Sequence, residues 1–384
     1  MIWGNDQAPK TPIMLGKSEL KIVPECKHMG ITLTSSKNAN VQSKLCNERI
    51  GLARSAFNAA RGIGSQLVPA PPNTLSKLYW SVALPRMAYG LEVVPVNKTT
   101  LFTMEHAHLQ HAKQIQGLPA NTHKPAALAT LGWISISGYI DIRKIMFLWH
   151  LLSMANGNIY QIVAKAVISK CENTTSEVMN KWSPIRDMYS SVCKYKLDRL
   201  LLSNISRGSW GDKTTSKGFI KHVIWTHEIR RWKASAPCYA ELKLYYEILD
   251  TIKFNVWWHF GSLRPHQLNN ISSVLAVLMG GQPKCLQRNF DSNKCQLCHD
   301  PRDHEDSPHI LFVCPALHNS RVRCTSSLLT GMPIAMREQF EAASARDKAS
   351  LLLSGFGGTF IAEWVELFSA AASYVQIIQS GNER

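Results

Sequence analysis

Four potential metal ligands lie close together in the sequence between residues 295 and 314. They are Cys295, Cys298, His309 and Cys314, in the run CQLCHDPRDHEDSPHILFVCP. A Cys-x-x-Cys turn lets two thiolates reach one ion, and a His and a Cys about a turn and a half apart on a short helix complete a tetrahedron. Sulfur and imidazole ligands favour zinc, and four protein ligands leave no position for a reactive water. The pattern therefore predicts a structural Zn²⁺ site.

A chance grouping is the alternative, because the chain contains 14 His and 10 Cys. Ligands in this order, with the apolar residues 310–313 between the last two, favour the metal site. Other nearby side chains are candidates for substitute ligands. They are Cys285, His299, His304, His318 and Cys324.

The net charge of the chain is strongly positive, +16 from 43 Lys and Arg against 27 Asp and Glu. Such a surface attracts polyanions, and nucleic acid is the expected partner. With 384 residues and 45% hydrophobic content, the chain is expected to fold with real cores and is not of the disordered class. No signal peptide and no membrane span is expected, and ten cysteines fit reduced thiols. We therefore expect an intracellular protein, in the nucleus and cytoplasm.

Half of the excess positive charge lies between residues 181 and 233, where there are twelve basic and four acidic residues, a local net charge of +8. Residues 221–233 are expected to form a helix with an apolar stripe of Trp225, Ile229 and Trp232. The candidate phosphate contacts are Lys221, Arg230, Arg231 and Lys233, together with Arg54 and Arg61 from an earlier helix. The alternative is a solvated face over a packed tryptophan core, and the sequence leaves both open.

The pattern of apolar residues predicts a mainly α fold. Short strands are expected at 12–16, 20–23 and 29–34, and a helical period begins near Val41 with a stripe of Ile50, Ala53, Phe57 and Ala60. Lys44, Arg49, Arg54 and Arg61 lie off this stripe. Further helices are expected near 75–84, ending before Pro85, and at 99–116, 136–155 and 157–169. An apolar stripe is also expected in the tail, from Phe360 to Ala371.

Other groups of reactive residues are weaker signals. Glu105, His106, His108 and His111 lack the His-Glu-x-x-His order of a metalloenzyme, so the pair His108 and His111 is predicted to decorate a helix surface. Trp257, Trp258 and Phe260 are interpreted as a buried aromatic cluster rather than as a stacking platform for bases. Catalysis by this chain alone is not expected, because it has no Asp-Asp pair to hold the two cations of nucleotidyl transfer.

Several segments together resemble the carboxy-terminal part of non-LTR retrotransposon reverse transcriptases. In order, they are KHMGITLT at 27–34, LYWSVALP at 78–85 with Tyr89-Gly90, KQIQGLP at 113–119, and the Cys-Cys-His-Cys segment followed by Pro315. The resemblance covers nearly the whole chain, and the zinc segment is its most specific part.

Periodicity, composition and charge divide the chain into five parts, and the resemblance implies what the parts correspond to. They are a palm-end β hairpin (1–36), a thumb-like helical bundle (37–170), a basic connector (171–284), a small CCHC zinc module (285–320) and a C-terminal helical tail (321–384). The thumb and the zinc module would hold RNA, DNA or an RNA/DNA hybrid through its backbone. The palm and fingers, with the catalytic aspartates, would belong to the same polyprotein but not to this chain.

Two functions from different classes remain. The first is a zinc-stabilised module that binds nucleic acid through phosphates. The second is a truncated structural or protein-interaction remnant with a structural zinc, no activity and an exposed apolar surface on residues 1–36. A continuous face of basic residues within 181–233 favours the first, and scattered basic residues favour the second.

Overall fold

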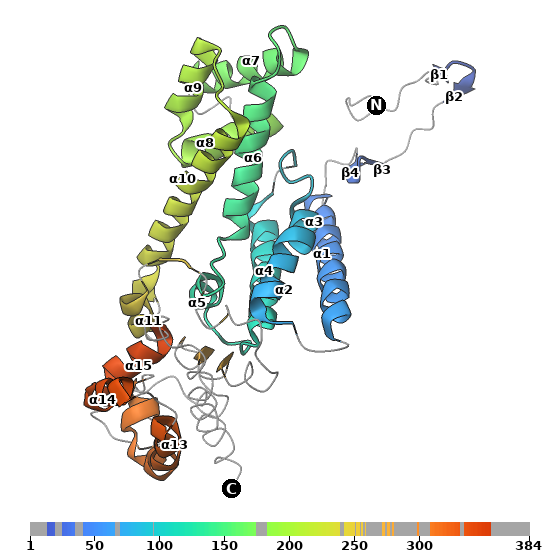
Figure 1. The fold of residues 1–384 in the computed structure, drawn as a ribbon. Coiled ribbons are helices and arrows are strands. Elements are labelled where there is room, and N and C mark those ends of the chain that lie inside the picture. The colour runs from blue at the N-terminus through green and yellow to red at the C-terminus, as the bar shows by residue number, and fades with distance from the viewer. Residues whose placement is uncertain are drawn as a thin grey trace.

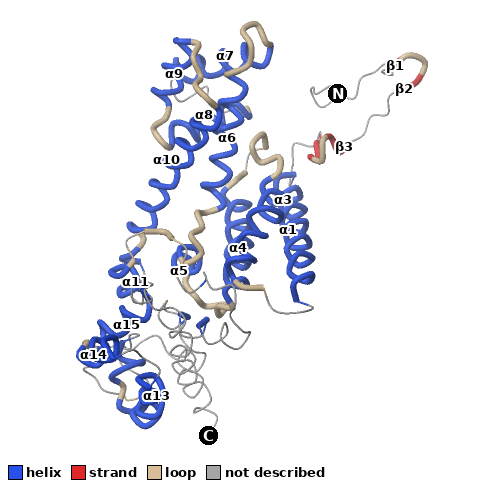
Figure 2. Tube along the Cα trace, in the orientation of Figure 1, coloured by secondary structure: helices blue, strands red, loops and turns tan. Residues whose placement is uncertain are grey.

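The structure is mainly helical, as the sequence predicts (Figures 1 and 2). This computed structural model describes residues 14–19, 25–34, 41–65, 70–94, 96–173, 183–238, 242–249, 251–253, 255, 258, 271–272, 275–276, 279, 298, 308–330 and 334–354. The α-helices are α1 (Val41–Ser65), α2 (Pro72–Leu78), α3 (Leu84–Ala88), α4 (Lys98–Gln116), α5 (Lys124–Ala129), α6 (Ile136–Leu152), α7 (Ile159–Asn173), α8 (Pro184–Lys194), α9 (Asp198–Arg207), α10 (Lys213–Ala234), α11 (Lys243–Ile248), α13 (His318–Thr330), α14 (Ile334–Ala342) and α15 (Ala345–Ser354). The structure also has two π-helices, η1 (Tyr79–Ala83) and η7 (His309–Val313), and two 3₁₀-helices, η3 (Ala236–Cys238) and η8 (Pro315–Leu317). The predicted tail stripe from Phe360 to Ala371 lies outside the described residues.

The N-terminal strands form two short antiparallel hairpins, β1 (Met14–Leu15) with β2 (Ser18–Glu19) and β3 (Glu25–His28) with β4 (Ile31–Thr34). The predicted strand at 29–34 begins too early, because Met29 and Gly30 have φ values of 49° and 73°. These two residues form the turn between β3 and β4, because tight hairpin turns commonly have positive φ at both central positions. Arg49 Nη2 donates to Gly30 O at 2.5 Å, and Tyr89 Oη donates to Met29 O at 3.0 Å. Side chains of α1 and of the residue after α3 thus hold this turn. The predicted strand at 20–23 lies outside the described residues.

Helix α1 follows the predicted apolar stripe. Ile50, Ala53 and Phe57 are buried in the main core, while Arg54 and Arg61 are exposed. Arg49 was expected off the buried stripe with these arginines, but it is buried, because its guanidinium reaches Gly30 O and lies 4.9 Å from the centre of the Tyr89 ring.

The sequence predicts that the helical segment after α2 ends before Pro85. This is wrong, because the segment continues through Pro85 into α3. The π-helix η1 precedes the proline, and Leu84 N donates to Tyr79 O across its wider turn. Pro85 then lies in the first turn of α3, and because it has no N–H it donates no backbone hydrogen bond to the preceding π-helix.

Helix α4 carries His108 and His111 into the main core, which corrects the prediction that they decorate its surface. Both are nearly fully buried. The Nδ1 of His108 lies 2.7 Å from Tyr79 Oη, its Nε2 lies 3.1 Å from Ile134 O, and its ring stacks on Trp133. Because both ring nitrogens have partners inside the protein, the histidine serves packing and not a surface function.

A second core lies between α6, α7, α8, α9 and α10, at the upper end of the molecule in Figure 1. Its polar centre is the buried Asp141 of α6, which accepts hydrogen bonds from Ser191 Oγ, Lys194 Nζ and Tyr195 Oη. Helix α10 contributes Ile224 to this core, and its other end contributes to the main core. The segment predicted as a basic connector therefore supplies residues to both cores.

The predicted stripe on α10 packs as expected. Trp232 is buried in the main core, and Trp225 and Ile229 pack against it. Trp258 is fully buried, in agreement with a buried aromatic cluster, and its Nε1 donates to Gln116 Oε1 at 3.1 Å. Trp257 and Phe260 lie outside the described residues. Among the helices that the structure describes, none combines the length and apolarity needed to cross a lipid bilayer.

Candidate metal centre and nucleic-acid interface

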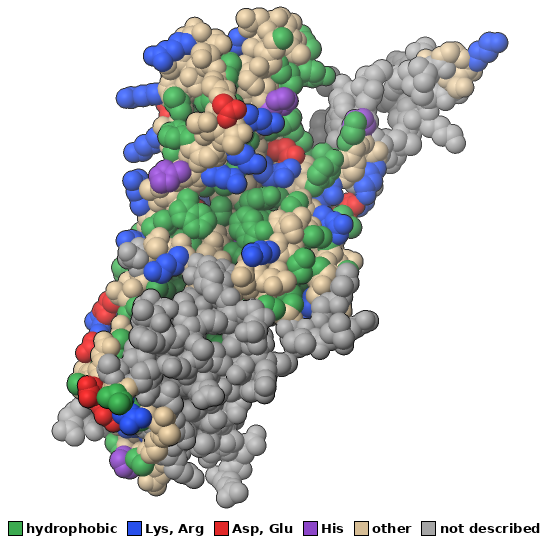
Figure 3. All heavy atoms as spheres, viewed as in Figure 1, with side chains coloured by type: hydrophobic (Ala, Val, Ile, Leu, Met, Phe, Trp, Pro, Cys, Tyr) green, Lys and Arg blue, Asp and Glu red, His purple; other side chains and the backbone are tan. Residues whose placement is uncertain are grey.

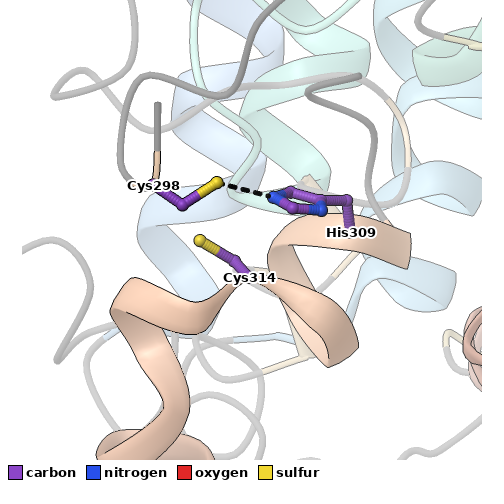
Figure 4. Close-up of side chains that lie close together, drawn as sticks. All are labelled: Cys298, His309 and Cys314. Atoms are coloured by element: carbon purple, nitrogen blue, oxygen red, sulfur yellow. Dashed lines mark hydrogen bonds between the residues drawn. The ribbon is translucent and has the colours of Figure 1, made fainter. Parts of the chain in front are cut away.

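Three of the four predicted metal ligands come together in the structure (Figure 4). The Sγ atoms of Cys298 and Cys314 and a ring nitrogen of His309 all lie within 4.8 Å of one another. Cys298 Sγ is 3.5 Å from His309 Nε2. A tetrahedral zinc with ordinary Zn–S and Zn–N bonds separates such a pair by about 3.6 Å. The cluster has the spacing of a shared metal ion and could hold one.

The π-helix η7 explains how His309 and Cys314 meet. The two residues are five apart, which on an α-helix would place them on different faces. Here Cys314 N donates to His309 O at 2.7 Å. This i to i+5 bond closes one π-turn. The sequence predicts a short helix between them, but the spacing of a turn and a half is wrong: one wider turn connects the two ligands.

Arg321 of α13 fixes the carbonyl groups at the end of this turn. Its Nη1 donates to Phe312 O at 2.7 Å, and its Nη2 donates to Cys314 O. The orphan carbonyls at a helix end are thereby satisfied by a cation, which is also the charge that the C-terminal end of a helix favours. Arg321 is not predicted from the sequence, where only its place seven residues after Cys314 points to it.

The candidate metal centre is anchored in the main core. His309 and Cys314 are buried, 5% and 0% exposed, while Cys298 is half-buried. Next to the ligands, Leu311 is buried, and the Phe312 ring meets the ring of Phe340 edge to face at 6.0 Å. A metal ion here would connect the segment at 298 to η7 and, through η7, to the core.

The fourth predicted ligand, Cys295, lies outside the described residues, as do Cys285, His299 and His304. Among the substitute ligands, His318 is exposed at the start of α13. The described part of the chain therefore holds three ligands in place, and the role of Cys295 stays a prediction.

Most basic side chains between 181 and 233 are exposed. Of the eleven that the structure describes, ten are exposed and Arg186 is half-buried. Of the four acidic residues only Asp212 is exposed, and it caps α10 by accepting from Thr215 N at 2.9 Å, a bond that lowers the pKa of its carboxyl. Figure 3 shows Lys and Arg side chains projecting along the edge of the molecule formed by α9 and α10. The positive charge of this segment is thus displayed to solvent.

The candidate contacts on α10 do not share one face. Lys221 and Arg230 are nine residues apart, two and a half helical turns, so they lie on opposite sides of the helix. Arg231 is also engaged, because its Nη2 donates to the buried Glu228 at 2.7 Å. Arg54 and Arg61, seven residues apart, share a face of α1, which lies on the other side of α4 and α6 from α10 (Figure 1).

A row of lysines on the first half of α10 was not singled out by the sequence analysis. Lys213, Lys217 and Lys221 are all exposed and follow one another every four residues, so they lie on one face. Lys196, in the turn between α8 and α9, is also exposed, as are Arg199 and Arg207 of α9. The signal in the sequence is the i, i+4 spacing of these lysines, which begins before the predicted helix at 221–233.

Comparison with known proteins gives no neighbour: no family model, no curated protein and no solved structure matches the chain.

Proposed function

We propose that this chain is a zinc-stabilised module that binds RNA, DNA or an RNA/DNA hybrid through backbone phosphates. The carrying observation is the imbalance of exposed charge over residues 183–233, with ten exposed basic side chains and one exposed carboxylate. Phosphate backbones are bound by such surfaces, because each neutralised phosphate releases a condensed counterion. The contact surface is the face of α10 that carries Lys213, Lys217 and Lys221, extended by the exposed basic residues near α9.

Zinc is the metal we assign to the cluster of Cys298, His309 and Cys314, with Cys295 as its fourth ligand. Thiolates and an imidazole select zinc over hard cations such as Mg²⁺. A site with four protein ligands is closed to substrate, so the ion contributes stability and no chemistry. We also propose, from the order of the segments quoted above, that the chain is the thumb and zinc region of a non-LTR retrotransposon reverse transcriptase. Its catalytic aspartates would then lie elsewhere in the polyprotein.

The test is a titration of the purified chain with labelled single strand, duplex and RNA/DNA hybrid at about 50 and about 200 mM salt. We expect affinity to fall steeply with salt. The double variant Lys217→Ala/Lys221→Ala should make the negative slope of log K against log salt shallower by about 1.5, since each phosphate contact contributes roughly 0.7 to 0.9 to its magnitude.

The matched control is Lys243→Ala/Lys253→Ala, which removes the same charge from exposed positions outside α10. This control should keep the wild-type slope. Equal slopes for all three proteins, or a wild-type affinity that does not respond to salt, would refute the α10 surface.

One observation favours the second candidate, a structural or protein-interaction remnant. Met14 and Met29, on the two N-terminal hairpins, are 53% and 75% exposed. Exposed apolar side chains on a hairpin suit a protein partner better than a phosphate backbone. Weak, salt-insensitive binding in the titration above would select this candidate.

A further inference from the structure

A pocket separate from the metal cluster lies between α4, α5, the start of α6 and α10. Its volume is about 580 Å³. This volume lies within the range of sites for small ligands. Trp133, Leu128 and Trp232 contribute apolar walls. Phe102, also in the lining, is 74% exposed, so its ring is available to a flat partner.

Two buried carboxylates line the pocket at the N-terminal end of α6. Glu105 Oε1 accepts from Ser137 N at 3.1 Å, and its Oε2 lies 2.9 Å from Lys124 Nζ. Glu228 is 3% exposed, and its Oε2 accepts from Ser135 N and Arg231 Nη2. Both carboxylates thus have a structural role at the start of α6.

Among the residues that the structure describes, Glu228 Oε1 and Glu105 Oε2 are both buried and accept no hydrogen bond. Glu105 Oε2 lies 2.9 Å from Lys124 Nζ, whereas the cation beside Glu228, Arg231, pairs with the other carboxylate oxygen, Oε2. A buried carboxylate oxygen left without a donor is costly, so a ligand that brings an N–H to Glu228 Oε1 gains a charge-assisted hydrogen bond.

The remaining charged side chains of the lining are positive. Lys98 is exposed, and the side chains of Lys124 and Arg231 are 42% and 49% exposed. With Glu105 and Glu228 the lining carries three basic and two acidic residues. An anionic group is therefore favoured at the exposed part of the pocket, while an N–H donor is favoured at Glu228.

We propose that this pocket takes one unstacked nucleobase of a single-stranded nucleic acid. The base would lie against Phe102, donate an N–H to Glu228 Oε1 and leave its phosphate near Lys98 and Lys124. A nucleotide unites all three requirements in one unit: a flat π-face, a ring or amino N–H, and a phosphate. In a duplex the Watson–Crick edge is already paired and the base stacked, so single strands are preferred. This inference rests on the proposed nucleic-acid binding.

The experiment compares three labelled 20-nucleotide probes of equal charge per strand: a mixed-sequence single-stranded DNA, its abasic counterpart and the duplex. Phe102→Ala should weaken binding of the single strand about tenfold, by the loss of one stacked base, and leave the abasic probe unchanged. Glu228→Gln should also weaken binding of the mixed-sequence single strand alone. The amide oxygen can keep the bond from Ser135 N, while the new NH₂ group is a donor and cannot accept the N–H of the base. Thermal melting checks that both variants fold.

The matched control is Phe219→Ala, which removes a 47% exposed phenylalanine of α10 outside the pocket and should change no affinity. The wild-type protein could bind all three probes with the same steep salt dependence, and Phe102→Ala could bind like the wild type. That result would support phosphate binding and refute the nucleobase pocket. If the wild-type protein binds none of the probes at about 50 mM salt, both proposals fall.

Discussion

At the scale of the residue, burial decides what the chemically active side chains do. His108 illustrates this, because its ring packs against the rings of both Tyr79 and Trp133 and both ring nitrogens have partners. Desolvation by burial lowers its pKa to about 4, against an opposing effect of the Glu105 carboxylate. The same desolvation lowers the pKa of His111. Both histidines are therefore neutral at pH 7 and belong to the core.

The depressed pKa of His108 predicts a pH dependence of stability. Between pH 6.5 and about 4 the unfolded chain takes up a proton that the folded chain does not, so stability is lost as the pH falls through this window. The loss from this one group is on the order of 3 kcal/mol, at about 1.4 kcal/mol per pKa unit. Urea unfolding at pH 7.5 and 4.5 measures it.

The variant His108→Gln separates this effect from that of other titrating groups. It removes the ionisable ring, so its stability should fall less between the two pH values than that of the wild-type protein, by about 2 to 3 kcal/mol. Parallel pH profiles for the two proteins would contradict a neutral, buried His108.

At the scale of the element, Gln116 at the end of α4 holds several segments together. Its Nε2 donates to Ala127 O in α5 at 2.7 Å, and its Oε1 accepts from Thr130 Oγ1 and Trp258 Nε1. Its backbone oxygen accepts from Ser272 Oγ at 2.6 Å. One buried amide thus connects α4, α5 and residues far along the chain.

Replacing Gln116 with Leu should lower the free energy of unfolding by about 2–4 kcal/mol. The change leaves Ala127 O and Trp258 Nε1 buried without this partner, and each such group costs roughly 1–3 kcal/mol. Chemical denaturation followed by tryptophan fluorescence measures the loss. Gln114 is an exposed position on the same helix. The control Gln114→Leu should therefore change the free energy of unfolding by less than about 0.5 kcal/mol. Equal effects of the two variants would show that the amide network carries no stability.

The sequence predicts the helices well and their polar contacts poorly. The stripe of Ile50, Ala53 and Phe57 locates α1, because the 3.6-residue period is a local property of the chain. The burial of His108 depends on Trp133 and Ile134, which the period of α4 does not reveal. Similarly, the spacing of Cys298 and His309 in the sequence predicts that they are metal ligands. It does not predict the π-turn between His309 and Cys314, whose residue Phe312 contacts Arg321 and Phe340.

A count of charges also does not predict which basic residues lie on the same face of the molecule. The charges between 181 and 233 sum to a local +8, but whether Lys221 and Arg230 act together depends on their angular positions on one long helix. The helix α10 begins at Lys213, earlier than the stripe at 221–233 suggests, and this extension adds the row of lysines.

At the scale of the whole molecule, the metal cluster and the lysine row lie far apart along the fold. The row is on the end of α10 that packs in the second core, whereas the cluster lies near α13 to α15, at the opposite end of the molecule (Figure 1). The α15 helix contacts both η7 and α11, and Arg346 of α15 pairs with Glu247 of α11. A metal ion would therefore stabilise the C-terminal part of the main core and act on the cationic surface only through that core.

The most direct test of the account is the zinc content of the purified protein, measured by inductively coupled plasma mass spectrometry. We predict about one zinc per wild-type chain and nearly none for Cys298→Ser and Cys314→Ser. The value should be unchanged for Cys238→Ser, which removes an exposed free cysteine far from the cluster in sequence. A wild-type chain that binds no zinc when supplied with it, or a Cys298→Ser variant that retains the full amount, would contradict the structural zinc centre of the proposed module.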